Sequence, residues 1–232
     1  MRTVLFIIGL MLLFSACKES EDYVYSDDSA YLPMHEGTVW IDSVTQITID
    51  DPSGVYDTLH WVEKTVVDSV QIYDELQRFY CSNYLFDTSA SRWIIDHIFW
   101  YEKSKNALLK FEQNKIWLEL VFPLYKNTNW NYYTYSTLAD TAIRSSVHEV
   151  DQLNNILGNI YDSTLVVHHH MDSTLIYKYT DQSFYVRNIG FLYREKVSII
   201  SDDPDYDYTL PIEERIKTAS ILKKRRYYGQ PQ

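Results

Sequence analysis

Alternation of apolar and polar side chains is the feature that most constrains the fold of this chain. In "KIWLELVF" (115–122), every second side chain is large and apolar, which is the period of a β-strand with one buried face. Short polar stretches such as "KSKN" (103–106) and "EQNK" (112–115) are typical of hairpin turns. Because parallel neighbours need long crossover connections, closely spaced hairpins predict an antiparallel meander.

The residue inventory also favours a sheet. The chain has 21 Tyr, 9 Phe and 6 Trp, which suit a half-buried pleated surface, and only six Gly and six Pro. We therefore predict an all-β fold with minor helix, a single antiparallel, strongly curved sheet or a partly closed barrel. The expected strands cover residues 39–49, 57–67, 69–86, 92–103, 107–113, 115–122, 130–135, 142–150, 160–169, 173–180, 191–200 and 215–228. Short helical segments are expected at 137–146 and 181–188, the second ending before Gly190 as a C-cap.

The N-terminus has the pattern of a lipoprotein signal peptide. Arg2 precedes an apolar run over residues 4–14, which is too short for a membrane span, and "FSAC" resembles a bacterial lipobox. We predict a signal peptide over 1–16, lipidation of Cys17, an acidic tether over 17–30 and one β-rich domain over 31–232 with an acidic loop at 201–214. The lysine at position 18 favours the outer membrane by resemblance to lipoprotein sorting, so the expected location is lipid-anchored there, on the periplasmic or the surface-exposed side.

Charge restricts the partners. Removal of the signal takes away Arg2 alone among the charged residues, so 20 Lys and Arg remain against 32 Asp and Glu. This acidic balance argues against a nucleic-acid partner. Cys81 is the only cysteine left once Cys17 carries lipid, so no disulfide within the chain is expected, and Cys81 is interpreted as a small buried apolar residue.

One short phrase occurs twice, as "LPMHEGTVW" (32–40) and "FPLYKNTNW" (122–130). Proline interrupts strand pairing, the Gly or Asn four residues later tolerates positive φ, and the tryptophan provides a core anchor. We interpret each copy as a strand-entry turn, and the sequence after each tryptophan does not repeat. The residues assigned to these turns and anchors are Pro33, Gly37, Trp40, Pro123, Asn127, Trp130 and, separately, Gly190.

These motifs carry a family resemblance. "YLPMHEGTVW", "LVFPLYKNTNWN", "YDSTLVV" and "YVRNIGFLYRE" follow the order of a family of uncharacterised Gram-negative outer-membrane lipoproteins with Phe-Pro-Leu, Trp and Tyr-x-x-Gly-Ile-Gly motifs. The match covers about residues 31–200. Asn127 stands where a glycine is commoner, and Asn188 stands at the first glycine of Gly-x-Gly. The resemblance implies a β-rich envelope domain and brings no known activity.

Two segments offer metal-ligating side chains. In "VVHHHMD" (166–172), His168, His170 and Asp172 would share one face of a strand and could chelate a transition metal; a polar strand end is the alternative. In "DDPDYDYTLPIEE" (202–214), the acids have the spacing of a calcium loop, but Tyr208 stands where such loops need glycine, and a solvated acidic loop is the alternative. The four candidate calcium ligands are Asp203, Asp205, Asp207 and Glu214.

The basic run "KKRRYY" (223–228) is interpreted as an edge strand protected by its charges, with contact to lipid headgroups as the alternative. The sequence lacks Gly-x-Ser-x-Gly, phosphate-loop, His-Glu-x-x-His and Cys-x-x-Cys signatures, so no catalytic residue and no cofactor is assigned. The leading hypothesis is a lipid-anchored, non-catalytic binding or scaffold module of the cell envelope, with an envelope protein or a glycan as partner. The alternatives are a carbohydrate-active or other hydrolytic enzyme and a carrier of an apolar ligand.

Overall fold

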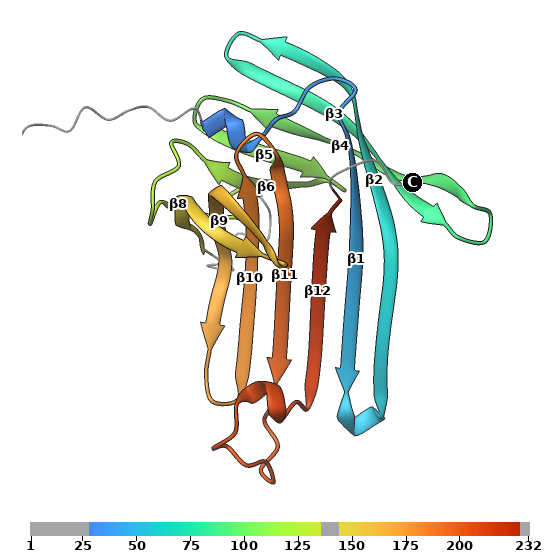
Figure 1. The fold of residues 1–232 in the computed structure, drawn as a ribbon, viewed down its shortest axis with the longest axis vertical. Coiled ribbons are helices and arrows are strands. Elements are labelled where there is room, and N and C mark those ends of the chain that lie inside the picture. Colours follow the sequence, from blue (N-terminus) through green and yellow to red (C-terminus); the bar gives the residue numbers. More distant parts are fainter. Residues whose placement is uncertain (1–27, 136–143, 228–232) are drawn as a thin grey trace, which may run out of the picture.

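The computed structural model describes residues 28–135 and 144–227, and most of them belong to one twelve-stranded sheet (Figure 1). The twelve strands are β1 (Val39–Asp50), β2 (Val55–Tyr73), β3 (Leu76–Asp87), β4 (Arg92–Lys103), β5 (Ala107–Glu112), β6 (Lys115–Val121), β7 (Asn129–Asn131), β8 (Arg144–Ile156), β9 (Asn159–Ser173), β10 (Tyr177–Val186), β11 (Gly190–Ile200) and β12 (Thr218–Arg226). Three short 3₁₀ helices complete the described chain: η1 (Asp28–Tyr31), η2 (Asp51–Ser53) and η3 (Ile212–Glu214). Within these described ranges, no helix is long and apolar enough to cross a membrane.

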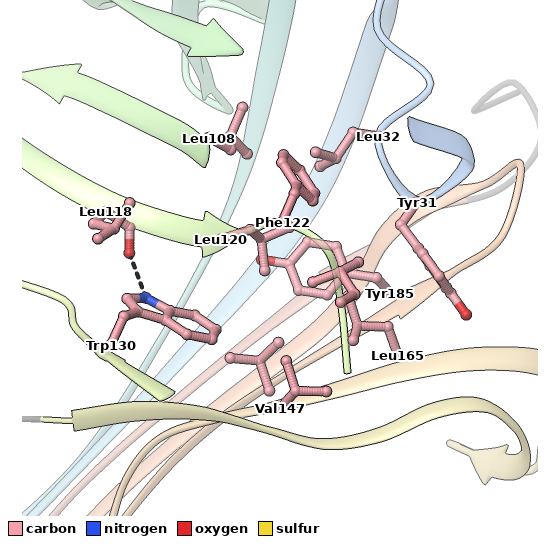
Figure 2. Close-up of a cluster of buried hydrophobic side chains, with 12 residues drawn as sticks. Tyr31, Leu32, Leu108, Leu118, Leu120, Phe122, Trp130, Val147, Leu165 and Tyr185 are labelled. Carbon is pink, nitrogen blue, oxygen red and sulfur yellow. Dashed lines mark hydrogen bonds between the residues drawn. The ribbon is translucent and has the colours of Figure 1, made fainter. Parts of the chain in front are cut away.

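The sheet is an antiparallel meander that is nearly closed. The strand order is β6-β5-β4-β3-β2-β1-β12-β11-β10-β9-β8-β7, so the first and last strands of the chain pair with each other, and β6 and β7 face across a single seam. At the seam, Leu118 N–H donates to the Tyr132 carbonyl at 3.0 Å, and the Trp130 indole N–H donates to the Leu118 carbonyl at 2.8 Å (Figure 2). The predicted all-β, strongly curved, partly closed sheet is confirmed.

The doubled phrase occupies the same place in each six-stranded half. In both copies the backbone amide of the turn residue donates to the carbonyl of a fully buried valine. The amide of that valine donates in turn to the carbonyl of the threonine that follows the turn residue. The bonds are Gly37–Val67 (2.9 Å), Val67–Thr38 (2.9 Å), Asn127–Val147 (2.8 Å) and Val147–Thr128 (2.8 Å). Each valine also lies beside a β-bulge, in the β2–β3 and β8–β9 pairings respectively. The phrase therefore docks the start of a half-sheet onto its second strand.

The two copies differ at their tryptophans. Gly37 (φ 81°) and Asn127 (φ 70°) both have the positive φ that a strand-entry turn requires. Trp130 is buried, with 6% of its surface exposed, whereas Trp40 is only half-buried. Both rings were expected to be core anchors, and Trp40 is the less buried of the two because it borders an interior hollow whose lining does not include Trp130.

The main apolar core lies where the N-terminal segment crosses the inside of the sheet. Tyr31 and Leu32 enter a cluster with side chains of β5, β6, β8, β9 and β10, including Leu120 and Leu165 (Figure 2). Asp28 is buried as well, and its carboxylate accepts a hydrogen bond from the Leu124 amide at 2.8 Å. The folded domain thus includes residues 28–30, which the sequence analysis assigned to the tether.

Several sequence predictions of local structure need correction. The segment 181–188 is not a helix, because residues 181–186 complete β10. Gly190 is not a helix cap: it opens β11 with φ 89° and lies against Pro33. Of the other expected helix, 137–143 lies outside the described residues and 144–146 begins β8. The basic run is not at an edge, because β12 is hydrogen-bonded to β1 and β11 on its two sides.

Candidate functional site

Three hollows follow one another along the inner face of the sheet, and together we call them the interior trough. The first, of about 150 Å³, lies under residues 31–34. The second, of about 260 Å³, shares Lys110, Glu119 and Arg194 with the first. The third, of about 470 Å³, shares Tyr179 with the second and reaches the far end of β10 and β11. The shared lining residues make the three hollows one continuous surface.

Strand alternation explains which side chains line the trough. Along β10, Ser183, Asp181, Tyr179 and Tyr177 face the same way because side chains of a strand alternate. On the neighbouring β11, Lys196 stands directly across from Asp181 in the register. The first hollow is lined in part by core residues such as Leu32 and Leu108, whereas the second hollow carries mainly charges and rings.

Ion pairs fix most of the charges in the middle of the trough. Arg194 donates two hydrogen bonds to Asp181, both at 2.9 Å. Glu112 accepts hydrogen bonds from Lys110 at 2.8 Å and contacts His97 Nε2 at 2.7 Å. Burial alone would raise the pKa of both carboxyls, but the neighbouring cations and their hydrogen bonds hold each pKa below its ordinary value. Both groups are therefore ionised carboxylates at neutral pH.

Glu119 is the carboxylate of the second hollow that has no cationic ion-pair partner among the described residues. It is 9% exposed, and its Oε1 accepts a hydrogen bond from the Tyr132 hydroxyl at 2.9 Å. Around it, the Trp117 ring stacks on Tyr132 at 5.4 Å and meets Tyr133 edge-on at 5.1 Å. A carboxylate beside three aromatic rings offers both a hydrogen-bond acceptor and flat apolar surface to a ligand.

The end of the trough near β1 and β12 is built from the basic run that the sequence analysis placed at an edge. Arg226 donates to Asp42 at 2.9 and 3.2 Å and lies between the rings of Trp40 and Phe191, at 4.7 and 5.0 Å. Lys224, on the same face, donates a hydrogen bond to the carboxylate of Glu63 in β2 at 2.6 Å. Two of the four basic side chains thus point inward as structural ion pairs.

The histidine run places its middle member inside the sheet. A register shift in the β9–β10 pairing at His169 turns that ring inward, where it lies between the hydroxyls of Ser145 (3.2 Å) and Ser183 (2.9 Å). Burial, together with the nearby charge of Arg194, lowers the pKa of His169 to about 3. The neutral imidazole is a fixed part of the trough wall.

The three predicted metal ligands do not converge. His168 stacks on His148 with ring centres 4.2 Å apart, His170 meets the ring of Tyr179 at 4.8 Å, and Asp172 accepts a hydrogen bond from Tyr177. The β9 register shift is the physical reason, because it breaks the alternation that would align them. Across the described parts of the chain, no group of three His, Cys, Asp or Glu side chains is placed to hold a metal.

The acidic loop also uses its carboxylates locally. Asp203 accepts from the Asp205 amide at 3.0 Å, and Asp207 accepts from the Thr209 amide at 3.0 Å, while Glu214 belongs to η3. The buried Arg215 holds the loop onto the sheet through hydrogen bonds to the carbonyls of Leu210, Ser201 and Leu175. The calcium-like spacing therefore produces turns rather than a shared coordination point. Cys17, the predicted lipidation site, lies outside the described residues.

Sequence reasoning did not find the trough. Lys110, Glu119, Asp181 and Arg194 come from four strands and form no local motif. The one available signal was alternation, since a charged residue on the apolar face of a strand needs a partner from another strand.

Comparisons with known proteins assign this chain to no family. No model of a known protein family matches the sequence, and no curated protein matches it. Among solved structures, the chain is similar to a Bacteroides fragilis protein with a YmcC-like fold, provisionally described as an exported protein. The two share 11% sequence identity at a TM-score of 0.40, over 85% of this chain and 99% of that one.

Proposed function

We propose that this protein is a lipid-anchored, non-catalytic binding module of the outer membrane that holds a glycan in its interior trough. The observation that carries the proposal is the trough itself, where the rings of Trp117, Tyr133 and Tyr179 alternate with fixed charges of both signs. Sugars present apolar faces to such rings and hydroxyl groups to such charges, so a ligand rich in both fits this lining. The anchor rests on the "FSAC" segment ending at Cys17.

The shape of the trough favours an extended ligand. Its three hollows run in sequence from residues 31–34 to the ends of β10 and β11, and Tyr179 and Tyr177 continue the aromatic lining beyond Trp117. A carrier of an apolar ligand would need a large apolar cavity. Each of the three hollows includes a charged side chain in its lining, so the carrier hypothesis finds no support in them.

The hydrolytic alternative depends on Glu119. Glycoside hydrolysis by paired carboxyls needs one carboxyl that stays protonated to act as acid. Glu112 and Asp181 have lowered pKa values because cations and hydrogen bonds hold them ionised, so neither suits that role. Glu119 is the remaining carboxylate of the second hollow. It provides the sharpest test between a binding module and an enzyme.

The experiment is a glycan array followed by calorimetry on any saccharide bound. Trp117→Ala should weaken binding on the order of tenfold or more, since aromatic anchors dominate contact energies. Trp100→Ala is the matched control, because Trp100 stacks on Phe111 on the opposite face of the sheet. Equal affinity in the two variants would refute the trough as the binding site.

The same samples separate the alternatives. A bound saccharide that is cleaved by the native protein but not by Glu119→Gln would replace the binding module with the hydrolase. If no glycan binds and an envelope protein is captured through the same trough residues, the module stands and its ligand class is wrong.

A further inference from the structure

The β8–β9 hairpin presents aliphatic side chains to solvent at its tip. Leu153, Leu157 and Ile160 expose 67%, 47% and 69% of their surface. The ten residues from 152 to 161, "QLNNILGNIY", contain no charged side chain, in a chain in which 23% of residues are charged. The tip therefore combines exposed apolar surface with an absence of charge.

The backbone conformation of the turn at the tip is a second unusual feature of this hairpin. Leu157 and Gly158, which connect β8 to β9, have φ values of 52° and 87°. Positive φ at both central residues is the pattern of a type I′ turn, where Asn and Gly are the residues that fit without strain. A leucine in the left-handed region strains the backbone, and Leu157 still leaves 47% of its surface in solvent. Such a residue is best explained by a contact outside the fold.

The hairpin also contacts the N-terminal segment where that segment enters the domain. The Tyr31 hydroxyl donates to the Asp151 carboxylate at 2.7 Å, and the Asp151 amide donates back to that hydroxyl at 3.1 Å. Asp151 is two residues from Leu153. Ten residues lie between Cys17 and Asp28, and the eleven steps from one to the other span at most about 40 Å. A lipid on Cys17 would therefore keep Asp28 within about 40 Å of the membrane, and the hairpin tip lies within reach of the bilayer at shorter extensions of the tether.

We infer that the tip of the β8–β9 hairpin inserts Leu153, Leu157 and Ile160 into the interfacial region of the lipid bilayer that anchors the protein. This inference rests on the lipid anchor of the proposed function. The uncharged tip has no charge to desolvate, and aliphatic side chains are favourably buried at the boundary between headgroups and acyl chains. The contact would fix the orientation of the domain above the membrane.

The test uses the full, lipid-modified chain in phosphatidylcholine vesicles whose acyl chains carry bromine. A bimane fluorophore is attached at Leu157→Cys or, as the matched control, at Leu175→Cys. Leu175 is 62% exposed in the turn at the other end of β9, a strand on the order of 45 Å long. Cys81 does not compete for the label, because its thiol is buried. We expect loss of fluorescence at position 157 and none at position 175.

A second variant keeps the inference testable if labelling disturbs the turn. Leu157→Asn places a favoured type I′ residue at the tip, so it should keep or raise the melting temperature while reducing bromine quenching of bimane at Ile160→Cys. Mass spectrometry of the same preparation reports the lipid on Cys17. Lipid present without quenching at 157 or 160 overturns the hairpin contact and leaves the anchor standing, whereas an unmodified Cys17 overturns the anchor as well. Shielding of the probe that needs no vesicles and rises with protein concentration would show a second copy on the tip and overturn the inference.

Discussion

Replacement of Trp130 by phenylalanine tests how the seam of the sheet is held. Trp130 is 6% exposed, and its indole N–H donates to the Leu118 carbonyl on the other side of the seam at 2.8 Å. Phenylalanine keeps most of the buried ring but removes the donor, so a buried carbonyl loses a hydrogen bond at a cost of about 1–3 kcal/mol. Trp130→Ala removes the ring as well and should cost about 3–5 kcal/mol, a large part of the ~5–15 kcal/mol that stabilises a domain.

Trp40→Phe is the matched control, because the equivalent tryptophan of the other copy is half-buried and its indole N–H has no hydrogen bond within the described chain. It should cost about 0.5–1 kcal/mol through weaker contact with the Arg226 guanidinium. Urea unfolding followed by far-ultraviolet circular dichroism gives the free energy of unfolding of each variant without relying on tryptophan fluorescence. Equal losses for Trp130→Phe and Trp40→Phe, or a larger loss for Trp40→Phe, would show that the indole bond does not hold the seam.

Three further predictions concern buried groups. The pKa of His169 is lowered to about 3 in the folded protein, whereas the ordinary value is about 6.5. As pH falls, the unfolded state therefore takes up the proton first. His169 should then reduce the free energy of unfolding by up to about 1.4 kcal/mol per pH unit below pH 6.5. His169→Gln should make the free energy of unfolding less dependent on pH in this range. If NMR showed the His169 imidazole of the folded protein titrating near pH 6.5, the prediction would be contradicted. Burial raises the pKa of the Cys81 thiol to about 12, so iodoacetamide should modify it only after denaturation; rapid alkylation of native protein would count against a closed core. Gly190→Ala should lose about 1–2 kcal/mol in urea unfolding, since the residue has φ 89° and the added Cβ would lie 3.1 Å from Pro33 Cδ; an unchanged midpoint would mean that the N-terminal segment is not pinned there.

Local pattern was sufficient for most of the strands and for both hairpin turns proposed from sequence. The turn at 112–115 is formed by Gln113 and Asn114, both with positive φ, where polar residues were expected. The apparent break between strands at position 68 is a β-bulge, and β2 continues through it to Tyr73. A bulge and a strand end both interrupt alternation, so one sequence leaves the choice between them open.

Long-range pairing explains what could not be predicted. Closure of the sheet depends on β1 meeting β12 across the whole chain, and that pairing turns Lys224 and Arg226 inward rather than toward an edge. The helix expected over 181–188 fails because β10 is paired along its length with β9 and β11, and this pairing overrides local propensity. The trough could not be predicted from the sequence for the same reason, because its lining side chains come from strands that are distant in the sequence.

NMR of the indole N–H groups during titration with a bound saccharide tests the central claim most directly. The chain has six tryptophans, of which Trp117 and Trp40 line the trough and Trp100 lies on the outer face. A glycan held in the trough should shift the Trp117 signal first and leave the Trp100 signal in place at saturation. A shift of Trp100 with Trp117 unchanged would place the ligand outside the sheet and contradict the account.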